Sequence, residues 1–80
     1  ILAQNGKRLH LVEVKQRRSH EEAIETVSSI QQERLWQSGL ALQEKKPRLR
    51  KLDLVIDLYT LAPGQWPRHQ INAFEKIERF

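Results

Sequence analysis

The stretch LVEVK at positions 11–15 decides the fold, because it places two opposite charges in an otherwise apolar run. Side chains in a β-strand alternate between its two faces, so Glu13 and Lys15 point to the same side of a strand. Leu9 and Leu11 precede them on that face. A carboxylate and an ammonium group in this position form either an ordinary surface ion pair or half of an active site.

The sequence before and after this stretch predicts the neighbours of the strand. Asn5-Gly6 is a strong turn signal, so we predict a hairpin with a first strand through about residue 3 and a second at 8–15. Both faces of the second strand carry apolar residues, which favours a central strand covered on both sides. A further strand is predicted at 52–59, where apolar and polar residues again alternate.

The region between these strands has a helical pattern. We predict a short helix at about 21–27 and a longer one at about 29–44, which ends at Lys45-Lys46-Pro47. The tail has two predicted parts, a short edge strand near 68–72 and then a helical turn that uses Phe74 and Ile77. The element order ββαβ predicts an α/β fold in which helices pack on a mixed sheet.

The longer helix has one broad face that we expect to contact the sheet. The residues of this predicted face are Ile30, Leu35, Ser38, Ala41 and Leu42. The small residues Ser38 and Gly39 would let the helix lie close to the sheet. Trp36 and Leu40 lie away from this face, and we interpret them as a second contact surface, for either an N-terminal segment or a homodimer.

Composition limits the class of protein. Eighty residues make one domain at most, and 39% hydrophobic content with a net charge of +4 favours anionic partners, nucleic acid first. No apolar run approaches the roughly 20 residues that span a bilayer. There is no cysteine, which excludes a disulfide framework and fits a cytoplasmic location. The chain starts without Met inside a predicted strand, so we expect residues 1–80 to be a domain that lacks its N-terminal part.

A Glu-x-Lys pair at the end of a central strand is the signature of PD-(D/E)XK nucleases, although such a pair also occurs by chance. Four segments widen the match: LVEVKQRR (11–18), EEAIETVSSIQQERL (21–35), LDLVID (52–57) and APGQWPRHQINAF (62–74). In their order and spacing they resemble the YraN-like family, bacterial endonuclease-like proteins similar to Holliday-junction resolvases. The resemblance runs from about Leu2 to Phe74 and implies a restriction-endonuclease-like core, a central mixed sheet flanked by helices.

The resemblance also implies roles for individual residues. Glu13 matches the second acidic metal ligand of the family and Lys15 its catalytic lysine. The backbone carbonyl of Val14, between them, would be a further ligand of Mg²⁺ or Mn²⁺. Gln31 matches a helix position that carries Lys or Gln in the family. It also fits the third position of a helix cap that begins at Ser28, so both interpretations stay open.

One element of the family pattern is absent. The first acidic ligand of the family lies on a strand just ahead of Glu13, and this sequence begins after it. Asp53 and Asp57 are not natural replacements, because both follow the helical region. We therefore expect the 80-residue chain to be catalytically impaired as it stands.

These residue types suit the hydrolysis of a phosphodiester bond. A divalent ion stabilises the developing negative charge and helps to generate the attacking hydroxide. A lysine beside it orients or deprotonates the water, or stabilises the charge in the transition state. The phosphates of the DNA backbone would be held by Arg17, Arg18 and Arg34. We therefore expect a metal-dependent endonuclease that acts on branched or flapped DNA.

Several alternatives stay open. The chain could be a DNA- or protein-binding module that keeps the fold without the chemistry, or an interaction domain that binds no nucleic acid. His10 is interpreted as a packed histidine, and His69 as structural rather than catalytic. We interpret Tyr59 and Trp66 as packing residues rather than as groups that stack on bases.

Overall fold

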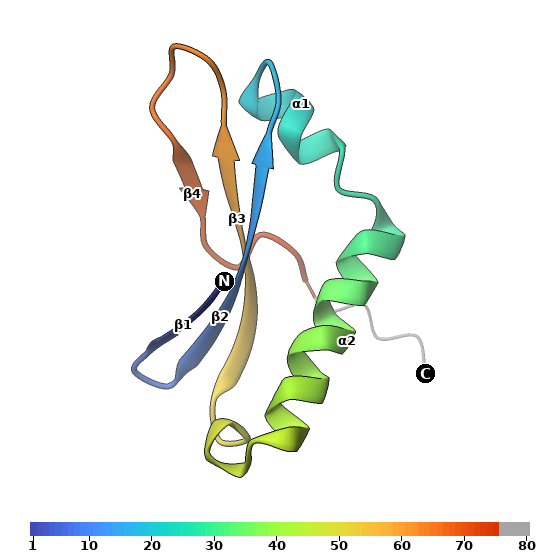
Figure 1. The fold of residues 1–80 in the computed structure, drawn as a ribbon, viewed down its shortest axis with the longest axis vertical. Helices are drawn as coiled ribbons and strands as arrows, with labels where there is room; N and C mark the ends of the chain where they lie inside the picture. Colours follow the sequence, from blue (N-terminus) through green and yellow to red (C-terminus); the bar gives the residue numbers. More distant parts are fainter. Residues whose placement is uncertain (76–80) are drawn as a thin grey trace.

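The computed structural model describes residues 1–75 (Figure 1). Its elements are β1 (Leu2–Asn5), β2 (Arg8–Gln16), α1 (His20–Glu25), α2 (Ser29–Lys45), the 3-10 helix η1 (Pro47–Leu49), β3 (Asp53–Leu61) and β4 (Arg68–Gln70). The predicted hairpin, two helices, third strand and edge strand are therefore confirmed. The α/β arrangement is consistent with the predicted restriction-endonuclease-like core. The part of the predicted C-terminal turn that involves Ile77 lies outside the described residues.

The four strands form one mixed sheet in the order β1-β2-β3-β4. The outer pairs are antiparallel, whereas β2 and β3 run parallel in a register that pairs Arg8 with Asp53. Parallel neighbours need a crossover connection, and α1 and α2 supply it here. The β1–β2 turn uses Gly6 in the left-handed region (φ 60°), as the Asn-Gly signal predicts. β2 is thus a central strand, as predicted.

Both helices pack on the same face of the sheet. Gly39 of α2 lies against the side chain of Leu54, and His20 of α1 hydrogen-bonds Thr60, and both partners belong to the same face of β3. The core between the layers consists of Val27, Ile56, Leu58 and Phe74. The opposite face carries no helix among residues 1–75 (Figure 1). Val14 on that face is 43% exposed, so the prediction that β2 is covered on both sides is wrong at this end.

The face that α2 turns to the sheet differs in part from the predicted one. Leu35 and Leu42 are half-buried as predicted, whereas the buried residues of the helix are Gly39 and Gln43. The predicted face residues that are instead exposed are Ile30, Ser38 and Ala41. Two contacts account for this difference: the Gln43 amide donates to two carbonyls beyond the helix, and Gly39 lets the helix lie close to Leu54 of β3.

Trp36 is also placed differently from the prediction. It is half-buried and packs against the hydrophobic core together with Leu35. It therefore does not form a surface separate from the core with Leu40, which is partly exposed. The predicted homodimer stays a prediction, but Trp36 belongs to the fold of the monomer.

Gly39→Val is expected to destabilise the protein by about 1–3 kcal/mol, the usual cost of overfilling a packed interface. A Cβ at this position would lie 2.6 Å from Cδ2 of Leu54 and 2.9 Å from its Cδ1. Ser38→Val on the exposed side of the same helix is the matched control. Urea denaturation measures both, and equal unfolding free energies for the two variants would show that the close approach is not tight.

Candidate functional site

Glu13 and Lys15 lie near the C-terminal end of β2, on the face of the sheet that the helices cover. Their neighbours on β3 are Leu58 and Thr60, respectively. Both charged side chains are half-buried, and no ion pair joins them to one another or to any other described residue. The ordinary surface ion pair is therefore not what the structure contains. Two partly desolvated opposite charges share one face and keep their polar groups free.

The backbone of Val14 faces an open edge of the sheet. Ile1 and Val12 exchange backbone hydrogen bonds across β1 and β2, at 2.7 and 3.3 Å. Backbone groups alternate in direction along a strand, so the Val14 carbonyl points to this same side, beyond the end of β1. No residue of the described chain pairs with it there. The role of this carbonyl as a metal ligand stays a prediction.

The same register defines the position opposite Glu13. Leu2 pairs with Leu11 and Ile1 with Val12, so a residue preceding Ile1 on a longer β1 would stand directly opposite Glu13. Directly opposed side chains point to the same face, with Cβ atoms about 4.5–5.5 Å apart. A carboxylate at that position would be close enough to share a metal ion with Glu13.

Gln31 lies in the first turn of α2 and is half-buried. Its backbone N–H donates to the Ser28 side chain at 3.1 Å, which confirms the predicted cap. No hydrogen bond connects the Gln31 amide with Glu13 or Lys15 among the described residues. The predicted phosphate-binding residues Arg17, Arg18 and Arg34 are all exposed. Arg17 and Arg18 follow β2 directly, whereas Arg34 lies one turn along α2.

His20 fixes the connection between β2 and α1 beside Lys15. It is buried, and its Nδ1 lies 2.7 Å from Oγ1 of Thr60, the direct neighbour of Lys15. Ser19 caps α1 by accepting a hydrogen bond from the Glu22 N–H. The second imidazole nitrogen of His20 is buried and has no hydrogen-bond partner within residues 1–75, and the same holds for the indole nitrogen of Trp36. These contacts hold the end of β2 in place.

A second polar cluster lies on the opposite face of the sheet. Asp57 is completely buried, and one of its carboxylate oxygens accepts hydrogen bonds from His10 Nδ1 and His69 Nε2, both at 2.8 Å. Its other oxygen accepts from the backbone N–H of Asn72 at 3.0 Å. The ring of His69 also stacks on Tyr59, with centroids 5.1 Å apart. Asp57 therefore joins β2, β4 and the segment after β4 to the central strand β3.

The hydrogen bonds set the charge of Asp57. Burial tends to raise the pKa of this carboxyl, but the bonds from Asn72, His69 and His10 outweigh it and lower the pKa below the ordinary 3.8. The group is therefore an ionised acceptor at neutral pH. It faces away from Glu13 and Lys15, so its geometry is that of a structural brace. The predictions that His10 packs and that His69 is structural agree with these contacts.

Sequence reasoning missed this brace although its parts were visible. Alternation places His10 and Glu13 on opposite faces of β2. It likewise places Asp57 and Leu58 on opposite faces of β3. Which residues meet depends on the parallel register, which pairs Val12 with Asp57. Neither strand contains a signal for that register, so the contact between His10 and Asp57 was not predictable from the pattern.

The described residues do not form a metal site by themselves. Nowhere in residues 1–75 do three or more His, Cys, Asp or Glu side chains come together in a way that could hold a metal ion. Glu13 and the Val14 carbonyl give two oxygen ligands, the type that Mg²⁺ prefers. They fit a divalent ion if a further acidic ligand joins them at the open edge.

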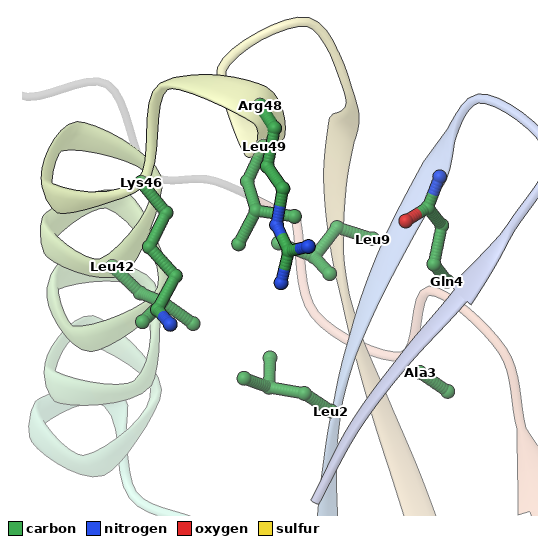
Figure 2. A pocket seen from close by; sticks show the side chains of 8 residues that line it. All are labelled: Leu2, Ala3, Gln4, Leu9, Leu42, Lys46, Arg48 and Leu49. Atoms are coloured by element: carbon green, nitrogen blue, oxygen red, sulfur yellow. The ribbon is translucent and has the colours of Figure 1, made fainter.

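A groove lies at the other end of β2, between β1 and the C-terminal end of α2 (Figure 2). It has a volume of about 230 Å³. Its lining is mostly apolar and includes Leu2, Leu9, Leu42 and Leu49. Figure 2 shows that the basic side chains of Lys46 and Arg48 extend over it. The groove is separate from Glu13 and Lys15, because Leu9 lies near the N-terminal end of β2 and those two residues lie toward its C-terminal end.

Within residues 1–75, no helix has the length and apolar character needed to cross a bilayer.

The fold and the site thus define an α/β domain with a Glu-x-Lys pair on its central strand, and comparisons with known proteins agree with the predicted resemblance. A UPF0102 protein of Caulobacter vibrioides is 43% identical over 74 residues, which are 92% of this chain and 59% of that protein. UPF0102 proteins of Caulobacter sp. and Sinorhizobium medicae are 42% and 36% identical over the same length, 53% and 61% of those proteins. UPF0102 is the YraN-like family. No protein-family model matches the chain.

The chain spans about three fifths of the length of the curated relatives it matches. The similarity to UPF0102 proteins extends over 74 of the 80 residues. The name UPF0102 specifies no activity, so the function is inferred from the residues of the site.

Proposed function

We propose that this chain is part of a UPF0102 protein that acts as a metal-dependent endonuclease on branched or flapped DNA. The proposal combines the similarity to UPF0102 proteins with the placement of Glu13 and Lys15 on β2. Mg²⁺ or Mn²⁺ is the metal that the oxygen ligands favour. DNA is the polymer that a net charge of +4 and the exposed arginines favour.

The observation that carries the proposal is the unpaired state of Glu13 and Lys15. Half-buried opposite charges usually pair, because a partly desolvated charge is costly. Here they lie on one face, and neither has an ion-pair partner among the described residues. Unpaired, half-buried charges destabilise the fold, but they suit the binding of an ion and a phosphate.

Each residue has a distinct task in the proposed reaction. The Glu13 carboxylate and the Val14 carbonyl hold the ion, which supplies charge stabilisation and an activated water when bound. The Lys15 ammonium, on the same face, orients the water or donates a hydrogen bond to the phosphate oxygens. Gln31 at the start of α2 is proposed to orient the scissile phosphate. Arg17, Arg18 and Arg34 hold neighbouring phosphates without reading the sequence.

A cleavage assay tests the proposal. The full-length protein is expected to nick a four-way junction and a flapped duplex in the presence of Mg²⁺ or Mn²⁺, and EDTA is expected to stop the reaction. A linear duplex of the same sequence is the matched substrate control. Absence of cleavage with both ions on all three substrates, by protein that is shown to be folded, would refute the endonuclease.

The second candidate is a binding module that has kept the fold without the chemistry. It is favoured by the fact that residues 1–75 contain no group of three or more His, Cys, Asp or Glu side chains that could hold a metal ion. A binding module would show salt-sensitive affinity for DNA without cleavage, because its contacts are mainly to phosphates. The sequence of the longer protein discriminates the two, since an acidic residue opposite Glu13 is needed for the metal site.

A further inference from the structure

Trp66, in the loop between β3 and β4, is 90% exposed. This is the largest exposed fraction among the large apolar side chains of residues 1–75. Tryptophan is on average a highly buried residue, so full exposure of its ring is unusual. The interpretation of Trp66 as a packing residue is therefore wrong. Tyr59, for which the same role was predicted, does pack, against His69.

The loop that carries Trp66 is held firmly at both ends. On one side Ala62 is buried, and its carbonyl accepts a hydrogen bond from the Gln65 N–H at 3.2 Å. On the other side Pro67 restricts the backbone, and the next residues pair with β3. Gly64 turns the chain in the left-handed region (φ 72°). The exposed ring is thus presented by an ordered loop whose shape does not depend on the indole.

Three arginines lie at the same end of the sheet as this loop. The backbone N–H of Arg17 donates to the carbonyl of Leu61, so the end of β2 lies beside the start of the loop. Figure 1 shows the β2–α1 connection and the β3–β4 loop at the same end of the sheet. Arg18 and Arg68 are exposed near it, and the guanidinium of Arg68 lies 3.7 Å from the Glu21 carboxylate. This long, exposed pair leaves Arg68 able to exchange its partner for a phosphate.

The loop also has a defined position relative to the candidate site. Lys15 and Arg68 both pair with Thr60, so they lie level with each other across three strands. Trp66 precedes Arg68 by two residues in the β3–β4 loop. This loop therefore lies beyond the same end of the sheet as Lys15.

We propose that Trp66 stacks on an unpaired base of a DNA single strand, while Arg17, Arg18 and Arg68 contact the adjoining phosphates. This inference rests on the proposed endonuclease function. It adds the structural feature of the DNA that the site would recognise, a single-stranded segment next to the scissile phosphate. An aromatic platform beside cations is how proteins bind single strands without reading sequence. A protein partner fits less well, because Trp66 is flanked by Gln65, Pro67 and Arg68 and not by a broad apolar patch.

Binding measurements with the full-length protein test this platform. The probes are a fluorescein-labelled oligothymidine of about ten nucleotides and a blunt hairpin duplex, at low salt. Trp66→Ala is expected to weaken oligothymidine binding about 5- to 150-fold, the range for the loss of one stacked base, and to change duplex binding less than about twofold. Trp66→Phe should retain most of the affinity. Ile71→Ala, which shortens another exposed apolar residue, is the control and should bind as the parent protein does.

Tryptophan fluorescence gives a second readout. Oligothymidine is expected to quench the emission of the parent protein, and the part of the quenching that Trp66 contributes should disappear in Trp66→Ala; within residues 1–80 the half-buried Trp36 is then the remaining tryptophan. Equal oligothymidine affinity of the parent protein and Trp66→Ala, or no affinity in either, would overturn the platform. If the protein cleaved DNA but gave such a binding result, the proposed endonuclease function would hold and the proposed role of Trp66 would be refuted. Stacking without cleavage would support the platform and refute the nuclease.

Discussion

Lys15→Ala is expected to lower the rate of DNA cleavage by the full-length protein about 10²- to 10⁴-fold, the usual contribution of a positioned proton donor or acceptor. The fold should survive, because Lys15 has no ion-pair partner among the described residues that its removal would leave behind. Glu13→Ala should have at least the same effect, since it removes the only carboxylate of the described site. Single-turnover cleavage of a labelled flapped duplex measures both.

A matched control separates chemistry from charge. Lys7→Ala removes an exposed lysine from the β1–β2 turn, at the opposite end of β2, and should cleave at the parental rate. Thermal unfolding of all three variants checks that the loss is not caused by misfolding. If cleavage persists in both Glu13→Ala and Lys15→Ala, the chemistry belongs to other residues and the site assigned here is wrong.

Asp57→Ala is expected to reduce the free energy of unfolding by about 3 kcal/mol or more, the cost of breaking a buried, charge-assisted hydrogen-bond network. The substitution leaves His10, His69 and the Asn72 N–H without their acceptor. It also releases the segment after β4, which brings Phe74 into the core. Asp53→Ala on the same face of β3 is the control, because the Asp53 side chain is exposed and should contribute little.

The effect of Asp57 should depend on pH. The pKa of its carboxyl is lower in the folded protein than the ordinary 3.8. A lowered folded-state pKa stabilises the protein at pH values above the unfolded-state value, and this contribution is lost as the pH falls through the folded-state value. Urea denaturation at a series of pH values should therefore show the full difference between the parent protein and Asp57→Ala near neutrality. The difference should narrow below about pH 3.8. A constant difference down to pH 2 would contradict the assignment.

Much of the fold was predictable because its signals are local. Asn5-Gly6 specifies a tight turn, Ser28 caps α2, and Lys45-Lys46-Pro47 ends it. Alternation within β2 placed Glu13 and Lys15 on one face without any knowledge of the neighbouring strands. The face of α2 that contacts the sheet was predicted less well, because it depends on the contact between Gly39 and Leu54, which are far apart in sequence.

The remaining features depend on long-range register or on solvent exposure. The contacts of Asp57 with His10 and His69 require the pairing of three strands to be known. The exposure of Trp66 was not predictable either, since an aromatic residue between two prolines is compatible with a packed loop or with an open one. The candidate site itself was named from a motif and a resemblance, and the structure adds its geometry.

The parallel pairing of β2 and β3 has a consequence for how the molecule assembles. It joins residues that are 45 positions apart, since Arg8 pairs with Asp53. Contacts of such high sequence separation form slowly, because the entropy of closing the intervening loop is lost before the contact stabilises it. The β1–β2 hairpin can form early, but Glu13 and Lys15 acquire their neighbours, and His10 its acceptor, only when β3 docks. The candidate site and the brace on the opposite face are therefore expected to appear in the same late folding event.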